Sequence, residues 1–151
     1  MTLTSTIKEQ IKDAMRARDS VRLTVLRGIS AAFTNELVTK GQKPDGELSD
    51  DDALTVIMRE SKKRKDSIEQ FSAACRPELA ESEQAELAII EEFLPAQMSR
   101  EEIEVAVQSK KEALGITDPA QKGQFIGMVM KDLKGKVDGK IVQEIVDYMF
   151  Q

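Results

Sequence analysis

Apolar residues recur at steps of three and four along nearly the whole chain, the spacing that places side chains on one face of an α-helix. No segment alternates apolar and polar residues for long enough to predict a strand. We therefore expect an all-α fold of seven helical segments. Their apolar faces are formed by Ile7, Ile11 and Met15; by Leu23, Leu26, Ser30, Phe33 and Leu37; by Val56, Ile57, Ile68 and Phe71; by Leu87, Ile90 and Leu94; by Ile103, Ala106, Val107 and Leu114; by Ile126, Val129, Met130 and Leu133; and by Ile141, Val142, Ile145, Val146 and Met149.

Capping residues predict where these segments begin and end. Side-chain oxygens of Ser, Thr and Asp satisfy the free N–H groups at a helix start, and Gly favours the left-handed conformation at a helix end. A turn-rich loop over residues 41–46 separates the second segment from the third. The predicted N-caps are Thr6 (with Glu9), Asp19, Ser49 (with Asp52), Ser99 (with Glu102) and Asp138; Pro77 fits a first turn, Asp118-Pro119 opens the sixth segment, and Gly115 is the predicted C-cap of the fifth.

The four prolines fall between the periodic segments, where a missing N–H group does no harm. Pro95 closes the first region of the chain. We expect an N-terminal helical domain over residues 1–94 and a C-terminal domain over residues 95–151, with a hinge near Pro95.

Composition excludes several kinds of catalytic site. The 151 residues include no His and one Cys, Cys75. The absence of His removes Ser-His-Asp and Cys-His catalysis and His-ligated zinc, and a single Cys removes any disulfide framework. No spacing of carboxylates requires a metal, so we predict no catalytic residue, metal or cofactor. We expect Cys75 to be a small, partly buried residue rather than a reactive thiol.

Charge and hydropathy bear on location and partners. The formal net charge is −5, so the molecule as a whole does not resemble a nucleic-acid binder. The N-terminus lacks the basic and apolar regions of a signal peptide, and no apolar run approaches the length of a membrane span. We expect a soluble, cytoplasmic protein with no membrane partner.

Residues 122–140 form a local exception, with five Lys against two Asp. Within them, Gly135–Lys140 reads GKVDGK, which lacks the spacing and the Ser/Thr of a phosphate-binding Walker loop. A turn with Asp138 as the N-cap explains the glycines, but it does not explain the lysines. The start of the last helix, between Lys136 and Lys140, is a candidate phosphate site. Gly123 and Gly127 share a helix face and predict a close helix crossing.

A second basic run covers Arg59–Lys65. Consecutive cations point all round a helix, so we interpret most of them as a solvated face paired with acids such as Asp66 and Glu69. A contact of Arg64 and Lys65 with backbone phosphates is the alternative. The five phenylalanines lie mostly at core-like positions, which leaves no aromatic platform for base stacking. Any nucleic acid would be held by its shape and its phosphates.

Several stretches together resemble the GatB/YqeY family, in order and over nearly the whole chain. The longest are Glu60–Phe71 (ESKKRKDSIEQF), Phe93–Ser99 (FLPAQMS) and Gly135–Val142 (GKVDGKIV); shorter ones are Leu23–Ser30, Arg76–Ala80 and Gly127–Lys131. Two positions depart from the pattern that we expect of the family. Val137 stands where we expect a small residue, and Cys75 stands where we expect Gly, which is the usual left-handed residue at a helix end.

The resemblance implies a larger N-terminal helical domain and a three-helix tail. It also implies kinship with the C-terminal region of the B subunit of the glutamine-dependent aspartyl/glutamyl-tRNA amidotransferase, whose tail helps to hold tRNA. The catalytic portion of that subunit has no counterpart here. A label of carbon–nitrogen ligase with glutamine as amido-N-donor would thus be inherited from the family, with no support from the residues.

Two functions follow as the leading hypotheses, ahead of a stand-alone enzyme. The first is a non-catalytic tRNA-binding or tRNA-metabolism accessory protein. The second is a protein–protein interaction module whose tail docks on a translation-related partner. The residues expected to contact RNA phosphates are Lys122, Lys131, Lys134, Lys136 and Lys140, with Arg64 and Lys65 as weaker candidates.

Overall fold

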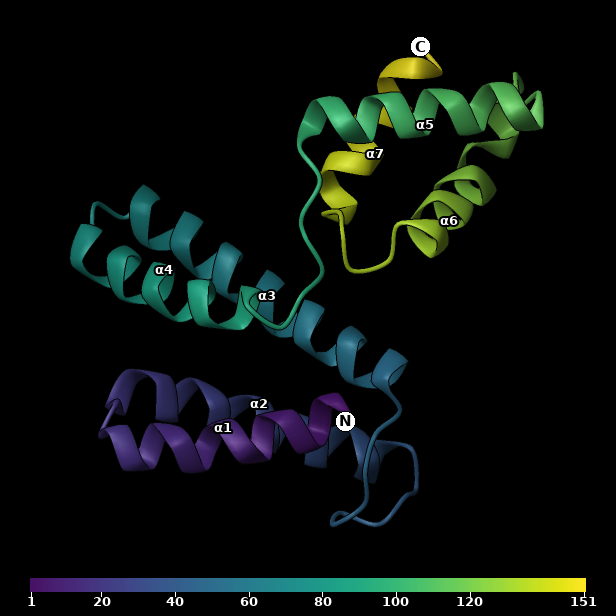
Figure 1. The fold of residues 1–151 in the computed structure, drawn as a ribbon. Helices are drawn as coiled ribbons and strands as arrows, with labels where there is room; N and C mark the ends of the chain where they lie inside the picture. Colours follow the sequence, from purple (N-terminus) through teal and green to yellow (C-terminus); the bar gives the residue numbers. More distant parts are fainter. The chain divides into compact units, whose positions relative to one another are not determined.

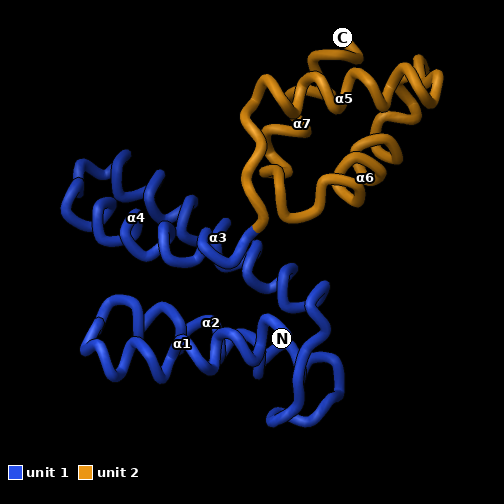
Figure 2. The backbone as a smooth tube through the Cα atoms, viewed as in Figure 1, with its two compact units in different colours: residues 1–94 blue, residues 95–151 orange.

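The computed structural model describes residues 1–151, which form seven α-helices, one short 3-10 turn and no strand (Figure 1). The all-α prediction is confirmed. None of the helices combines the length and the apolar character that crossing a membrane requires. The chain divides into two compact units, Met1–Leu94 and Pro95–Gln151 (Figure 2).

The first unit consists of two helical hairpins. Helices α1 (Leu3–Ala17) and α2 (Ser20–Thr39) form one, and α3 (Asp50–Ala73) and α4 (Pro77–Glu91) form the other. Helix α2 contacts all three of the others. Burial of apolar side chains between the hairpins stabilises the unit; the buried cluster contains Ile7, Ala14, Val25, Leu26, Ile29, Phe33, Leu37, Leu48, Ala53, Val56, Ile57 and Ile90.

The N-caps of α2 and α3 are those predicted from the sequence, whereas that of α1 is not. Asp19 accepts a hydrogen bond from the Arg22 N–H (3.0 Å), and Ser49 accepts one from the Asp52 N–H (3.2 Å). The predicted cap Thr6 is wrong, because α1 begins earlier, with Thr2 as its N-cap. The earlier start lets Leu3 pack against the core. Thr6 lies inside the helix, and its hydroxyl donates to the Thr2 carbonyl (2.9 Å).

Helices α1 and α3 end in a left-handed residue that is not glycine. Arg18 and Cys75 both have φ of 57°. In α3 the Arg76 N–H donates to the Phe71 carbonyl (2.8 Å), which closes a Schellman motif. The break between α3 and α4 thus falls where it was predicted, with Cys75 in a conformation that favours Gly. The expectation that Cys75 is partly buried is wrong, because the left-handed turn leaves its side chain exposed.

The second unit contains α5 (Arg100–Leu114), a 3-10 turn η1 (Pro119–Gln121), α6 (Lys122–Asp132) and α7 (Gly139–Met149). The predicted caps of α5 are confirmed: Ser99 accepts from the Glu102 N–H (3.2 Å), and Gly115 is left-handed with φ of 63°. The core of the unit is a second buried cluster, formed by Ile103, Val107, Phe125, Val129, Val137, Val142, Ile145 and Val146.

Two predictions about packing in this unit are wrong. Leu114 is 48% exposed. It is the last residue of α5 and lies seven residues beyond Val107, the last buried residue of that helix. Gly123 and Gly127 support no close crossing, since a Cβ at either position would meet nothing within 4 Å. Phe125 and Val129 are the buried residues of α6. The glycines, two positions away from them, therefore lie on the opposite side of the helix.

Candidate nucleic-acid interface

Four of the five predicted tail lysines lie in or beside the connection between α6 and α7. Lys131 is in the last turn of α6, Lys134 and Lys136 follow it, and Lys140 is in the first turn of α7. All four are exposed. We call the segment Lys131–Lys140 the lysine turn.

Lys122 does not belong to the lysine turn. It lies at the other end of α6, nine residues before Lys131, which corresponds to about 14 Å along the helix. Its ammonium group forms an ion pair with the Asp147 carboxylate of α7, at 2.5 Å. The structure thus groups four of the predicted residues and separates the fifth.

The backbone of the lysine turn is attached to the chain that precedes α5. The side-chain amide of Gln97 donates to the Gly135 carbonyl (2.7 Å) and to the Pro95 carbonyl (2.8 Å). The Met98 N–H donates to the Lys136 carbonyl (2.9 Å). Gly135 has φ of 81°, a conformation that residues with a side chain rarely adopt. These bonds direct two carbonyls of the turn inward and fix its path.

Two further residues anchor the lysine turn. Val137 is 5% exposed and packs in the core of the second unit. The position where we expected a small residue is therefore a core position that a valine fills. Gly139 lies close to α6, since a Cβ there would be 3.4 Å from the terminal methyl carbon of Met130.

The start of α7 does not offer the phosphate site that the sequence suggested. Asp138 is the N-cap, as predicted, and its carboxylate accepts the Lys140 N–H at 2.9 Å. A phosphate at that N–H would lie beside this negative charge, which repels it. The exposed positive charges of this segment are therefore on its lysine side chains rather than at the helix N-terminus. The other carboxylate of the segment, Asp132, pairs with Lys110 of α5.

Arg64 has a structural role in the first unit. Its guanidinium bridges two carboxylates of α4, Glu83 at 2.9 Å and Glu86 at 2.7 Å. Burial by itself lowers the pKa of Arg64, but the hydrogen bond to Glu83 and the charge of Glu86 outweigh it, so the pKa lies above its ordinary value. Arg64 is therefore committed to holding α3 against α4. Lys65, beside it on α3, is half-buried.

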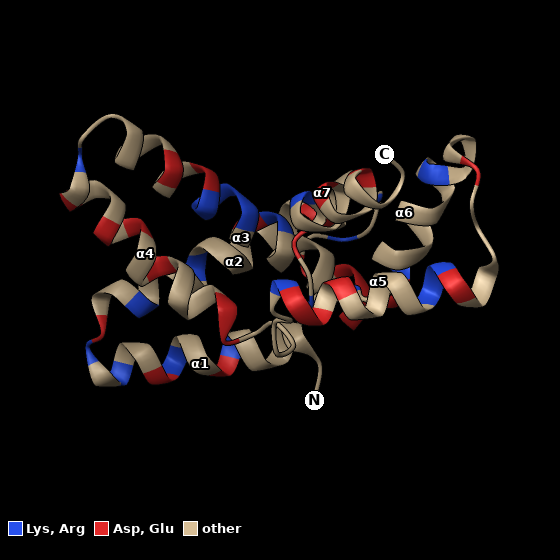
Figure 3. Ribbon diagram, turned by 90° about the horizontal axis from the view of Figure 1, so that it is seen from above, with Lys and Arg blue, Asp and Glu red and all other residues tan.

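Two further cations of the basic run, Arg59 and Lys63, also form ion pairs with nearby acids. Arg59 pairs with Glu36 of α2 at 3.2 Å, and Lys63 pairs with Glu60 at 3.0 Å. Figure 3 shows blue stretches of Lys and Arg on α3 and red stretches of Asp and Glu along α4. Of the four ion pairs that Arg59, Lys63 and Arg64 form, three reach across to neighbouring helices.

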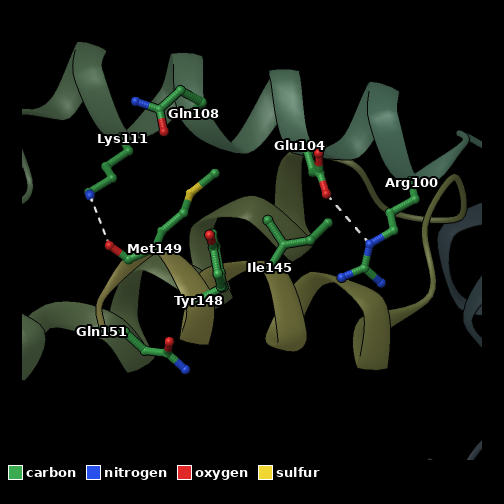
Figure 4. A pocket seen from close by; sticks show the side chains of 8 residues that line it. All are labelled: Arg100, Glu104, Gln108, Lys111, Ile145, Tyr148, Met149 and Gln151. Carbon is green, nitrogen blue, oxygen red and sulfur yellow. Dashed lines mark hydrogen bonds and ion pairs between the residues drawn. The ribbon is translucent and has the colours of Figure 1, made fainter.

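Sequence reasoning missed one exposed aromatic residue. Tyr148, the only tyrosine, is 76% exposed on α7. It lines a groove of about 540 Å³ between α5 and α7, shown in Figure 4. The sequence pattern did not single out this residue, because Tyr148 directly precedes Met149, which belongs to the predicted apolar face of α7. The other lining residues are Arg100, Glu104, Gln108, Lys111, Ile145, Met149 and Gln151.

The structure contains no group of three or more Cys, Asp or Glu side chains placed to hold a metal ion. Cys75 is exposed, and the chain has no second cysteine. The chemical groups that the described surfaces expose are lysine ammonium groups and one aromatic ring.

Comparison with known proteins identifies the family. The family model described as Yqey-like protein matches residues 4–149. Three similar fungal proteins are each named altered inheritance of mitochondria protein 41, mitochondrial. The one from Pyrenophora tritici-repentis is 32% identical over 149 residues, which cover 93% of this chain and 78% of the relative. Those from Saccharomyces cerevisiae strain YJM789 and Kluyveromyces lactis are 31% and 30% identical, over 90% and 89% of this chain and 70% and 68% of the relatives.

These names correct one expectation from the sequence. The relatives are named as mitochondrial proteins, which contradicts a cytoplasmic location. The cytoplasmic location was inferred from the lack of a secretory signal peptide and of a membrane span, and neither of these bears on import into an organelle. The resemblance of the sequence motifs is confirmed by a match over almost the full length, and this chain belongs to the YqeY-like protein family.

Proposed function

We propose that this protein is a non-catalytic tRNA-binding accessory protein that holds RNA phosphates on the lysine turn. One observation carries the proposal. The lysine turn, a segment of ten residues, has four exposed lysines, Lys131, Lys134, Lys136 and Lys140. Hydrogen bonds from Gln97 and Met98 hold the backbone of this segment in place. Lysines that contact phosphates supply most of the affinity in sequence-independent binding.

The fixed backbone matters for affinity as well as for geometry. Binding orders flexible segments at a cost in conformational entropy, and a turn that is already ordered avoids much of that cost. The lysines reach outward from a rigid base, so they suit the regular phosphate array of a folded RNA. The resemblance to the tail of the amidotransferase B subunit supports tRNA as the RNA in question.

The test is the binding of the purified chain to total tRNA across a salt titration, with a duplex DNA of equal charge for comparison. We expect saturable tRNA binding that is tighter than DNA binding. A four-lysine variant, in which Lys131, Lys134, Lys136 and Lys140 are each replaced by Gln, should lose most of it.

The chain offers a matched control. Replacing the exposed residues Lys8, Lys12, Lys62 and Lys63 by Gln changes the net charge by the same amount, on helices of the first unit. This control variant should bind tRNA nearly as the unmodified chain does. Equal losses in both variants, or tRNA and DNA binding that is equal and vanishes at moderate salt, would contradict the proposal.

A protein–protein interaction module is the second candidate. The exposed side of α2 favours it, because six exposed positions at steps of three and four carry no charge; they are Val21, Thr24, Gly28, Ala31, Asn35 and Val38. Arg27 is the one exposed charged residue of this helix, and an outer face with so few charges is typical of one that a partner covers. If the tRNA titration shows no saturable binding, docking on a translation-related protein becomes the preferred function.

A further inference from the structure

We propose that the groove between α5 and α7 binds an unpaired nucleobase of RNA, stacked on Tyr148. The proposal rests on the proposed function in that both require the protein to bind RNA, but it concerns a different surface and a different kind of contact. The lysine turn would contact phosphates. The groove would contact a base.

The groove has the form and lining of a stacking site. In Figure 4, Tyr148 lies near the middle of the groove, between Ile145 and Met149 of the same helix, with α5 across from it. Tyr148 is 76% exposed, so its ring contributes little to the stability of the fold. Bases stack on exposed aromatic rings, and the contact tolerates any base because each has a π face. The volume of about 540 Å³ is ample for a base and its ribose.

The polar side chains of α5 can contact the edge of a stacked base. Glu104 and Gln108 lie one helical turn apart and both line the groove. One N–H of the Gln108 amide donates to Glu112 at 2.8 Å, which leaves the carbonyl oxygen and the second N–H for a ligand. Both side chains therefore present acceptors. Cytosine, adenine and guanine carry an exocyclic amine that donates, whereas uracil does not, so we expect the groove to favour amine-bearing bases.

Tyr148 of the groove and Lys140 of the lysine turn lie on the same side of α7. Lys140, Glu144 and Tyr148 follow at steps of four, and all are exposed. Residues four apart share one side of a helix, and the distance from Lys140 to Tyr148 is about 12 Å. A few nucleotides of single strand cover that distance. The acid between them is already paired, since Glu144 binds the Arg100 guanidinium at 3.1 Å, which reduces its repulsion of a phosphate.

The protein supplies its own probe for this proposal. It has one tyrosine and no tryptophan, so its intrinsic fluorescence comes from Tyr148 alone. We would titrate the whole chain with oligocytidylate and with oligouridylate of equal length. Free tyrosine amide, titrated in parallel, corrects for light absorbed by the nucleotides. We expect saturable quenching by oligocytidylate and weaker quenching by oligouridylate.

Substitutions at Tyr148 separate stacking from mere apolar contact. We would measure the binding of a dye-labelled oligocytidylate by fluorescence anisotropy. Tyr148→Ala and Tyr148→Leu should weaken binding about tenfold, within the range that stacking of one base supplies. Tyr148→Phe should bind as the unmodified chain does. The exposure of Tyr148 makes a folding defect unexpected, and circular dichroism of each variant checks this.

The outcomes distinguish the two proposals. If Tyr148→Ala binds oligocytidylate as tightly as the unmodified chain does, and oligocytidylate does not quench the fluorescence of Tyr148, the base-binding groove is overturned. The lysine turn is then still supported if the four-lysine variant binds tRNA poorly. Quenching by oligocytidylate that persists in the four-lysine variant supports the groove, and it contradicts the lysine turn if that variant also keeps its affinity for tRNA. No binding of any RNA overturns both proposals.

Discussion

The side-chain amide of Gln97 donates a hydrogen bond of 2.7 Å to the carbonyl of Gly135, which lies 38 residues further along the chain. This bond joins two of the stretches that carry the family resemblance, Phe93–Ser99 and Gly135–Val142. The main-chain bond from Met98 to Lys136 (2.9 Å) reinforces it. Both stretches therefore serve one structural purpose, which is to hold the lysine turn.

Replacing Gln97 by Ala should destabilise the second unit by about 1 kcal/mol, because the buried Gly135 carbonyl loses its donor. Urea denaturation followed by the fluorescence of Tyr148, which lies in this unit, measures the change. Gln143→Ala, at an exposed position of α7, is the control and should change the free energy of unfolding little. Equal stability of the Gln97 and Gln143 variants would contradict the role given to this bond.

Replacing Arg64 by Gln should destabilise the first unit by about 1–2 kcal/mol and leave RNA binding unchanged. The substitution leaves Glu83 and Glu86 facing one another without their shared cation. Lys62→Gln, at an exposed position two residues away, should affect stability little. Thermal unfolding followed by circular dichroism gives the first quantity, and tRNA binding gives the second. A loss of RNA affinity in Arg64→Gln without loss of stability would restore Arg64 as a phosphate contact.

Replacing Cys75 by Gly should stabilise the α3–α4 hairpin by about 0.5–1 kcal/mol. A side chain in the left-handed conformation is strained, and Gly removes that strain at some cost in backbone entropy. The neighbouring Ala74 has φ of −85°, so Ala74→Gly relieves no strain and should not stabilise. Chemical denaturation of both variants decides the point, and a destabilised Cys75→Gly would show that the strain is absent.

The pKa of Glu78 should depend on Arg76. The hydrogen bond from the Arg76 guanidinium (2.7 Å) lowers the pKa of Glu78 below its ordinary value. A carboxyl whose pKa is lowered by folding adds stability above its unfolded pKa, and this stability is lost as the pH falls through the folded pKa. Arg76→Gln should therefore raise the midpoint of the Glu78 titration, as followed by NMR of its side chain. An unchanged midpoint would show that the pair does not persist in solution.

The sequence predicted helix starts well where the signal is local. Asp19, Ser49, Ser99 and Asp138 are N-caps in the structure, because a cap depends on one side chain and an N–H two or three residues further on. The start of α1 was misplaced because residues 2, 4, 5 and 6 all carry hydroxyls. Tertiary contacts select Thr2 among them, since Leu3 packs against the core and its N–H donates to the Asp50 carboxylate at 2.9 Å.

Features that depend on tertiary contacts were predicted poorly. The spacing of Gly123 and Gly127 is that of a helix crossing, but no helix covers that side of α6. The partners of Arg64 lie on α4, 19 and 22 residues away, where no local pattern points to them. The one sequence signal for an exposed Tyr148 is its position at the edge of the apolar face of α7. Its exposure follows from the way α5 and α7 pack.

The most direct test of the central claim is the slope of log affinity for tRNA against log salt concentration, for the unmodified chain and the four-lysine variant. Each phosphate contact contributes about 0.7–0.9 to the slope. If the lysine turn holds four phosphates, the variant should lose about 3 from the magnitude of the slope, while the control variant with Lys8, Lys12, Lys62 and Lys63 replaced keeps it. Parallel lines for the unmodified chain and the four-lysine variant would contradict the assignment of the RNA-binding surface to the lysine turn.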